Sequence, residues 1–225
     1  MKKLLMFSMA IVMALSACMQ NNKKQLPEVG DKKYYEVTNI TPDTSMTVFL
    51  VSEVTDVNDS IATIAHNYTF YDGEIITDTV RSEINGVDSQ VSLKALFAKD
   101  LMMFNRDSLE FVEGTEKVIY KSHMEENTVM EPVRLVLRTV ENGAEVMIEL
   151  SVEERKVYAK EDVTTPAGTF SCIKFSENHV AKIGDEVSFS NVVYWFNIKN
   201  DVLVKQTISN KTGEPYLVMV LTKEE

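Results

Sequence analysis

Apolar and polar residues alternate along most of this sequence, most clearly on either side of Asn142-Gly143. A period of two is that of a β-strand, because successive side chains of a strand point to opposite faces. Asn-Gly readily takes the positive backbone angles of a two-residue hairpin loop. Such a loop sets Leu137 opposite Ile148 and extends one apolar face along both strands. The alternation therefore predicts an antiparallel hairpin with one buried face and one wet face.

Similar patterns predict strands over most of the remaining chain. Turn signals stand at Asp72-Gly73, at 165–168 and at 210–213. Apart from the hairpin over 134–152, strands are expected at 46–54, 62–71, 74–84, 109–112, 117–121, 157–163, 169–175, 189–198, 202–209 and 216–222. This spacing of short strands and turns is typical of an all-β domain.

Only the segment 89–101 has helical periodicity. Its apolar stripe consists of Leu93, Leu96, Phe97 and Leu101, with Ser89 or Ser92 as the expected N-cap. So many antiparallel strands must curl or split into two layers to bury their apolar faces. We predict a mainly β fold, with a single, strongly curved antiparallel sheet or incomplete barrel and one short helix. A two-sheet sandwich is the competing geometry.

The N-terminus has the features of a secretory signal peptide. Lys2 and Lys3 precede an apolar run over 4–15 that is too short to span a membrane. Leu15-Ser16-Ala17-Cys18 resembles the bacterial lipobox, in which the cysteine is acylated. We therefore expect a signal peptide over 1–17 and a lipidated Cys18 whose acyl chains bind the membrane. A flexible tether over 18–32 and a single β-rich domain over 33–225 would follow.

Charge and cysteine content narrow the function classes further. The formal net charge is -11, and loss of Lys2 and Lys3 with the leader makes it -13. Such a domain repels phosphate backbones, so we expect no nucleic-acid partner. With Cys18 acylated, Cys172 is the one remaining thiol and has no cysteine with which to form an internal disulfide. A free cysteine within a strand usually packs as a small apolar side chain.

No motif in the sequence signals catalysis, a metal or a cofactor. His66, His123 and His179 have no second ligand at metal-binding spacing, and phosphate-loop and nucleophile-elbow motifs are absent. We predict a non-enzyme without cofactor or metal.

The densest aromatic group gives the candidate ligand-binding residues Tyr194, Trp195 and Phe196. On a strand, Tyr194 and Phe196 share one face while Trp195 takes the other. They either line a cavity or form core.

Two segments near the C-terminus carry a resemblance to a known family. The sequences "RKVYAKEDVTTPAGTFSCIKF" and "YWFNIKNDVLVKQ" resemble the TapB-like lipoproteins. The resemblance implies a lipid-anchored, strand-rich envelope domain with no established enzymatic activity, and it supplies no catalytic residues. Members often carry a glycine just before the final Val-Lys, where this chain has Asn200-Asp201.

Our leading hypothesis is a non-catalytic envelope protein that binds an apolar or amphipathic small molecule, such as a lipid, inside a curved sheet. The alternative is a protein–protein interaction module of the cell envelope. Residues 20–24 contain no acid. This favours anchoring in the outer membrane with the domain facing the periplasm.

Overall fold

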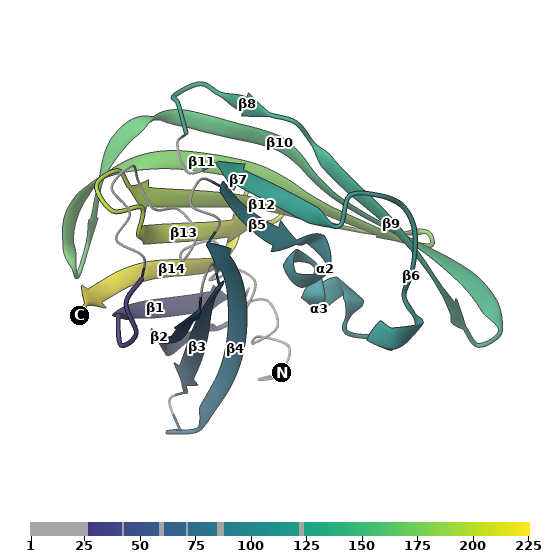
Figure 1. Ribbon diagram of the computed structural model, residues 1–225, viewed down its shortest axis with the longest axis horizontal. Helices are drawn as coiled ribbons and strands as arrows, with labels where there is room; N and C mark the ends of the chain where they lie inside the picture. The colour runs from purple at the N-terminus through teal and green to yellow at the C-terminus, as the bar shows by residue number, and fades with distance from the viewer. Residues whose placement is uncertain (1–26, 42, 59–60, 71, 85–87, 122–123) are drawn as a thin grey trace.

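A computed structural model shows one antiparallel sheet that curls over two short helices (Figure 1). It describes residues 27–41, 43–58, 61–70, 72–84, 88–121 and 124–225. Cys18 and His123 lie outside these residues. Within them, no helix is long and apolar enough to cross a membrane.

The strands are numbered along the chain. They are β1 (Lys32–Ile40), β2 (Ser45–Asn58), β3 (Ile61–Thr69), β4 (Ile75–Ile84), β5 (Asp88–Ser92), β6 (Glu110–Gly114), β7 (Lys117–Lys121), β8 (Val129–Met130), β9 (Val133–Glu141), β10 (Ala144–Thr165), β11 (Gly168–Ile183), β12 (Glu186–Asn197), β13 (Leu203–Ser209) and β14 (Pro215–Glu224). The helices are α2 (Leu93–Leu96), α3 (Ala98–Leu101) and a 3-10 turn over Arg106–Ser108.

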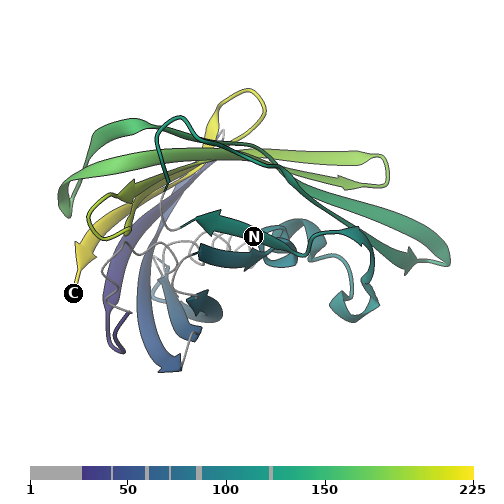
Figure 2. The ribbon, with the colours of Figure 1, turned by 45° about the horizontal axis from the view of Figure 1, so that its top comes forward.

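The predicted fold class is confirmed: the strands form one 14-stranded sheet that does not close, rather than a sandwich. Its order is β6-β9-β10-β11-β12-β13-β14-β1-β2-β3-β4-β5-β7, with β8 pairing with β10 beside β9. Figure 2 shows the sheet rolling so that β5 and β7 lie inside the arch made by β10 to β14. The curl gives the sheet a concave inner face on which most of the apolar core lies.

The hairpin around Asn142-Gly143 has the predicted register. Leu137 is paired with Ile148, and both side chains are buried. Asn142 and Gly143 have φ values of 51° and 81°, the positive angles that the loop requires. On the wet face, Arg138 forms an ion pair with Glu145.

The strand β10 differs from its prediction because it is a single strand of 22 residues. Before Glu153 the even-numbered residues face inward, whereas Arg155 and Val157 face inward after it. The register with β11 shifts between Glu153 and Lys156, and Glu154 has a φ of 48°. This β-bulge reverses the alternation without ending the strand. The reversed alternation explains why the sequence pattern predicted two separate strands here.

The predicted helix over 89–101 is wrong in its first turn. Asp88 to Ser92 form β5, which pairs with β7 along its whole length. Ser92 occupies the N-cap position of α2 but makes no side-chain capping bond. The apolar stripe that begins at Leu93 is buried as expected, in two short helices that meet at Phe97. Strand pairing with β7 outweighed the helical periodicity of residues 89–92.

The chain makes its first contacts with the sheet just before β1. The amide of Gly30 donates to the carbonyl of Val54, and the amide of Val54 donates to the carbonyl of Asp31. Strand β1 begins at Lys32, one residue before the predicted start of the domain.

Gly114→Ala should destabilise the β6–β9 pairing. Gly114 has a φ of +100°, and an added Cβ would lie 2.2 Å from the carbonyl oxygen of Arg134. We expect a loss of at least about 1 to 3 kcal/mol in the free energy of unfolding, measured with urea. Gly143→Ala is the matched control, because its φ is +81° and nothing lies within 4 Å of the added Cβ. Equal losses of stability in the two variants would show that the positive φ alone causes the loss and that the contact with the Arg134 carbonyl adds nothing.

Candidate functional site

The three predicted aromatic residues lie on opposite faces of β12. Tyr194 and Phe196 are buried on the concave face, where their rings stack at 5.8 Å. Tyr194 also stacks on Phe175 of β11 at 5.8 Å. The column belongs to the core, and Tyr194 in addition lines a cavity described below.

Trp195 points to the convex face, away from the other two. Lys174 and Lys205 lie over its ring at 5.3 and 5.0 Å. Its indole nitrogen donates a hydrogen bond to Glu161. Trp195 is therefore enclosed by charged side chains of neighbouring strands and takes no part in an interior site.

A buried carboxylate lies at the centre of the concave face. Glu177 of β11 is fully buried, and its Oε1 accepts hydrogen bonds from Tyr120 at 2.8 Å and Tyr194 at 3.3 Å. The ring Nε2 of His179 lies 2.8 Å from the same oxygen. We call Tyr120, Arg155, Glu177, His179 and Tyr194 the Glu177 cluster. It joins β7, β10, β11 and β12.

Arg155 supplies the opposite charge and fastens β7 to the sheet. Its Nε donates to Oε2 of Glu177 at 3.3 Å. One terminal nitrogen donates to the carbonyl of Ile119 at 3.0 Å and the other to that of Glu131 at 3.3 Å. The guanidinium also lies 4.9 Å from the centre of the Tyr120 ring. All three guanidinium nitrogens are thereby used, as a buried cation requires.

Within the Glu177 cluster, opposite charges and hydrogen bonds offset the cost of burying charged groups. Burial alone would raise the pKa of Glu177, but the hydrogen bond and charge of His179 and the charge of Arg155 outweigh it, so the pKa is lowered. Burial, followed by the nearby Glu177 carboxylate, raises the pKa of Tyr120 and of Tyr194 well above the ordinary value. Both phenols therefore remain hydrogen-bond donors.

A groove opens beside this cluster, between α3 and the ends of β11 and β12. Its volume is about 410 Å³, and its apolar walls are Met102, Met103, Ala181, Ile183 and Val187. Its polar rim consists of Lys99, Asp100, Glu186 and Ser188. We call it the α3 groove.

A smaller cavity of about 50 Å³ adjoins the α3 groove and shares three lining residues with it, Lys99, Asp100 and Ser188. Its further lining includes Phe97, His179, Ser190, Tyr194, Gln206 and Tyr216. We call it the inner cavity. The hydroxyl of Ser188 donates to Asp100 at 2.6 Å, so one hydrogen bond links α3 to β12 where the two spaces meet.

The remaining candidates for chemistry are buried, and burial shifts their pKa values away from the physiological range. Cys172 is fully buried, and burial raises its thiol pKa to about 12. His66 is also buried, and burial lowers its pKa to about 4. The described part of the chain brings together no group of three or more His, Cys, Asp or Glu side chains that could hold a metal ion.

The sequence did not reveal the Glu177 cluster. Tyr120 and Arg155 are far from Glu177 along the chain, and Glu177 and His179 stand in a strand whose sequence shows ordinary alternation. The one available signal was the reversal of that alternation in β10, which turns Arg155 inward.

Comparison with known proteins places the chain in a family. Residues 28–221 match the family described as DUF3108-like. The chain belongs to the DUF3108-like family. The resemblance to TapB-like lipoproteins stays a prediction. Comparison with the curated proteins finds no match.

Solved structures share the fold of this DUF3108-like protein. One is a protein from Bacteroides fragilis assigned to export, with a YmcC-like fold: the identity is 20%, the TM-score 0.56, and the match covers 88% of this chain and 96% of that one. Another, from Parabacteroides distasonis and assigned as a lipoprotein, is 14% identical with a TM-score of 0.60 and the same coverage, 88% and 96%. At these identities the likeness establishes the fold alone.

The turn after β12 uses an aspartate in a conformation that favours glycine. Asp201 has a φ of 55°, and its amide donates to the carbonyl of Asn197. Its side chain is buried, and burial raises its pKa to about 7. The Asn200-Asp201 pair thus makes a left-handed turn without the glycine that the resemblance led us to look for.

Loss of the Glu177 charge should strongly destabilise the fold. Glu177→Gln leaves Arg155 buried without an opposite charge, for which we expect a loss of about 3 to 5 kcal/mol. Tyr120→Phe should lose about 1.5 to 3 kcal/mol, the contribution of a hydrogen bond to a charged group. Both are measured by urea unfolding. Tyr34→Phe is the matched control, because Tyr34 donates to Glu225 at an exposed position and should change stability little.

The same variants have a pH signature. Because the folded-state pKa of Glu177 lies below its ordinary value of 4.5, its contribution is present above that pH and is lost as the pH falls through the folded pKa. Glu177→Gln should therefore lose less stability than the parent on acidification below this value. An unchanged acid slope would contradict a charged Glu177.

Proposed function

We propose that this protein is a non-catalytic, lipid-anchored envelope protein that binds an amphipathic small molecule through the α3 groove. The observation that supports the proposal most directly is the groove itself, an apolar hollow with a polar rim. Its volume of about 410 Å³ lies in the range of small-molecule sites. Apolar walls suit a hydrocarbon chain, and a polar rim suits a head group at the water boundary.

The groove walls are unusually exposed for apolar side chains. Met103, just after α3, is 70% exposed, and Val187 of β12 is 64% exposed. Methionine is flexible and polarisable, so it adapts its shape to apolar ligands. Covering these side chains with a hydrocarbon chain would remove apolar surface from water, which favours binding.

A charge placed in the groove should weaken binding. We would place the full-length protein, prepared from membranes, in phospholipid nanodiscs and label it with a photoreactive fatty methyl ester. Met103→Glu and Val187→Glu should each reduce labelling about tenfold, because a buried carboxylate excludes a hydrocarbon chain.

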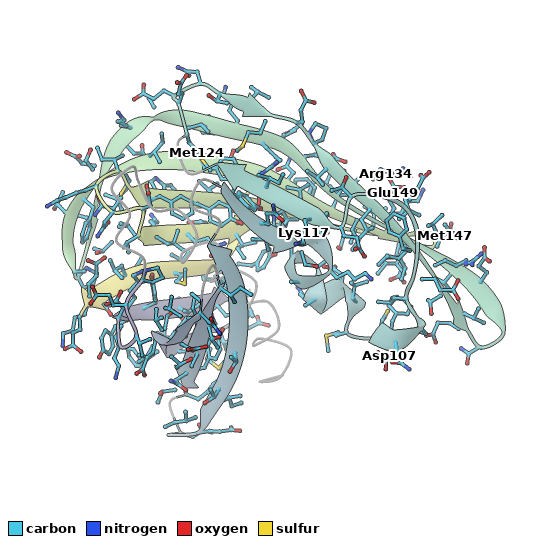
Figure 3. All side chains as sticks on the ribbon, viewed as in Figure 1. Asp107, Lys117, Met124, Arg134, Met147 and Glu149 are labelled. Atoms are coloured by element: carbon cyan, nitrogen blue, oxygen red, sulfur yellow. The ribbon has the colours of Figure 1, made fainter. Side chains whose placement is uncertain are left out.

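Met147→Glu is the matched control. Met147 is also an exposed methionine, 42% exposed, but it does not line the groove, and its side chain lies on the wet face of β10, the face of Arg134 and Glu149 (Figure 3). Its substitution should leave labelling unchanged. The proposal fails if Met103→Glu and Val187→Glu take up as much label as the parent protein, or if the parent takes up no label and its organic extracts contain no lipid.

The membrane anchor is the second part of the proposal. We propose that Cys18 is acylated and holds the domain at the outer membrane, facing the periplasm. Cells fed radiolabelled palmitate should incorporate it into the parent protein and not into Cys18→Ser. Protease added to whole cells should then leave the domain intact, while digestion at the cell surface would reverse the proposed orientation.

Binding of a partner protein at a sheet edge is the alternative function. Strand β6 lies at one end of the sheet, and all of its residues are exposed, including Phe111 at 52% and Val112 at 44%. An unpaired edge with apolar side chains can add a strand from another chain. Cross-linking from Phe111 that captures no specific protein would remove this alternative.

A further inference from the structure

The inner cavity contains a buried amide with unused hydrogen-bonding capacity. Gln206 of β13 is fully buried, and neither its oxygen nor its nitrogen has a partner at hydrogen-bonding distance among the described residues. Its strand neighbour on β12 is Tyr194. A side-chain contact between the amide and the Tyr194 hydroxyl, which donates its hydrogen to Glu177, partly offsets the rise in the pKa of that hydroxyl. This contact falls outside hydrogen-bond geometry, so both polar atoms of Gln206 keep unused capacity.

An unpaired buried amide is costly. Leaving a buried donor or acceptor unsatisfied costs about 1 to 3 kcal/mol, and most such groups in native proteins have a partner. Leucine or methionine would fill the same place on β13 without that cost. The structure therefore provides a partner for Gln206 only if another molecule enters the cavity.

The cavity has room for such a partner and lies next to the α3 groove. Its volume of about 50 Å³ exceeds the ~10–15 Å³ that one water needs. It shares Lys99, Asp100 and Ser188 with the groove. A chain lying in the groove would thus bring its polar end to the junction at Asp100 and Ser188, and the head group could extend toward Gln206.

The charges around the cavity favour an uncharged head group. Asp100 lines it, and the Glu177 carboxylate is bonded to both His179 and Tyr194 in its wall. Two lining residues can carry a positive charge, but His179 is bonded to Glu177, and the ammonium of Lys99 lies 5.6 Å from the centre of the Tyr216 ring. A carboxylate or phosphate would face two carboxylates and is disfavoured.

The side-chain amide specifies the complementary chemistry. Its oxygen accepts and its nitrogen donates from adjacent positions. A carboxamide presents the same pair in reverse, so it satisfies both atoms at once, whereas an ester offers only acceptors.

Resting on the proposed function of the α3 groove, we infer that Gln206 and the inner cavity bind the primary carboxamide group of a fatty amide whose chain lies in the groove. Gln206 is then the residue that selects the head group, while Met103 and Val187 accommodate the chain.

Competition among three head groups on the same chain tests this inference. The full-length protein in nanodiscs is labelled with a photoreactive fatty amide, the matched fatty acid and the matched methyl ester, and labelled peptides are mapped by mass spectrometry. We expect the amide to label residues of α3, β12 and β13 about tenfold more strongly than the acid or the ester. Gln206→Leu should remove this preference while the ester still labels the groove.

Two further variants keep the result interpretable. Gln206→Met has a side chain of similar length without an amide, so it should also abolish the amide preference. It serves as the test if Gln206→Leu fails to fold. Gln90→Leu is the matched control, because Gln90 on β5 accepts a hydrogen bond from Lys117 and does not line the cavity. It should retain the amide preference.

The outcomes separate the two proposals. Equal labelling by all three probes, unaffected by Gln206→Leu, would show that only water fills the inner cavity, and would overturn this inference while the groove stands. A preference for the acid would overturn it as well. Absence of labelling by any probe would overturn both this inference and the proposed function.

Discussion

The buried ion pair between Arg155 and Glu177 is the interaction on which the shape of this molecule depends. An open sheet that curls must keep its inner edge strand in place, and β7 pairs only with β5 in the sheet. Arg155 holds β7 by bonding the carbonyl of Ile119, while Tyr120 of β7 donates to Glu177. Neither charge could be buried alone, so the cluster forms only when the roll of the sheet is complete.

The β-bulge in β10 makes this pair possible. Without the one extra residue near Glu154, the alternation of β10 would turn Arg155 toward solvent on the convex face. The bulge also bends the strand, and Figure 1 shows β10 and β11 arching over the rest of the molecule. This local irregularity thus contributes to the bend of β10 and sets the position of the buried cation.

The rolled sheet positions the candidate binding site. The helices α2 and α3 follow β5, so they are carried inside the arch beside the concave ends of β11 and β12. They bury Leu93, Leu96 and Leu101, but Met103 just after α3 remains exposed at the groove. Tyr194, the middle ring of the aromatic column, lines the inner cavity together with Gln206. A rigid cluster therefore lies directly behind an adaptable groove, which is a favourable arrangement for selecting a ligand by its head group.

The sequence by itself determined the fold class, most strand positions and the register of the Asn142-Gly143 hairpin, because alternation and turn chemistry are local properties of the chain. It also placed Tyr194 and Phe196 on one face of their strand and Trp195 on the other. Only the tertiary structure decided that Asp88 to Ser92 form a strand, that β10 continues through its bulge, and that Tyr120, Arg155 and Glu177 meet. The α3 groove and the orphaned amide of Gln206 likewise arise from residues distant in the chain. These features depend on how the sheet rolls, and a roll is set by long-range contacts that no local pattern encodes.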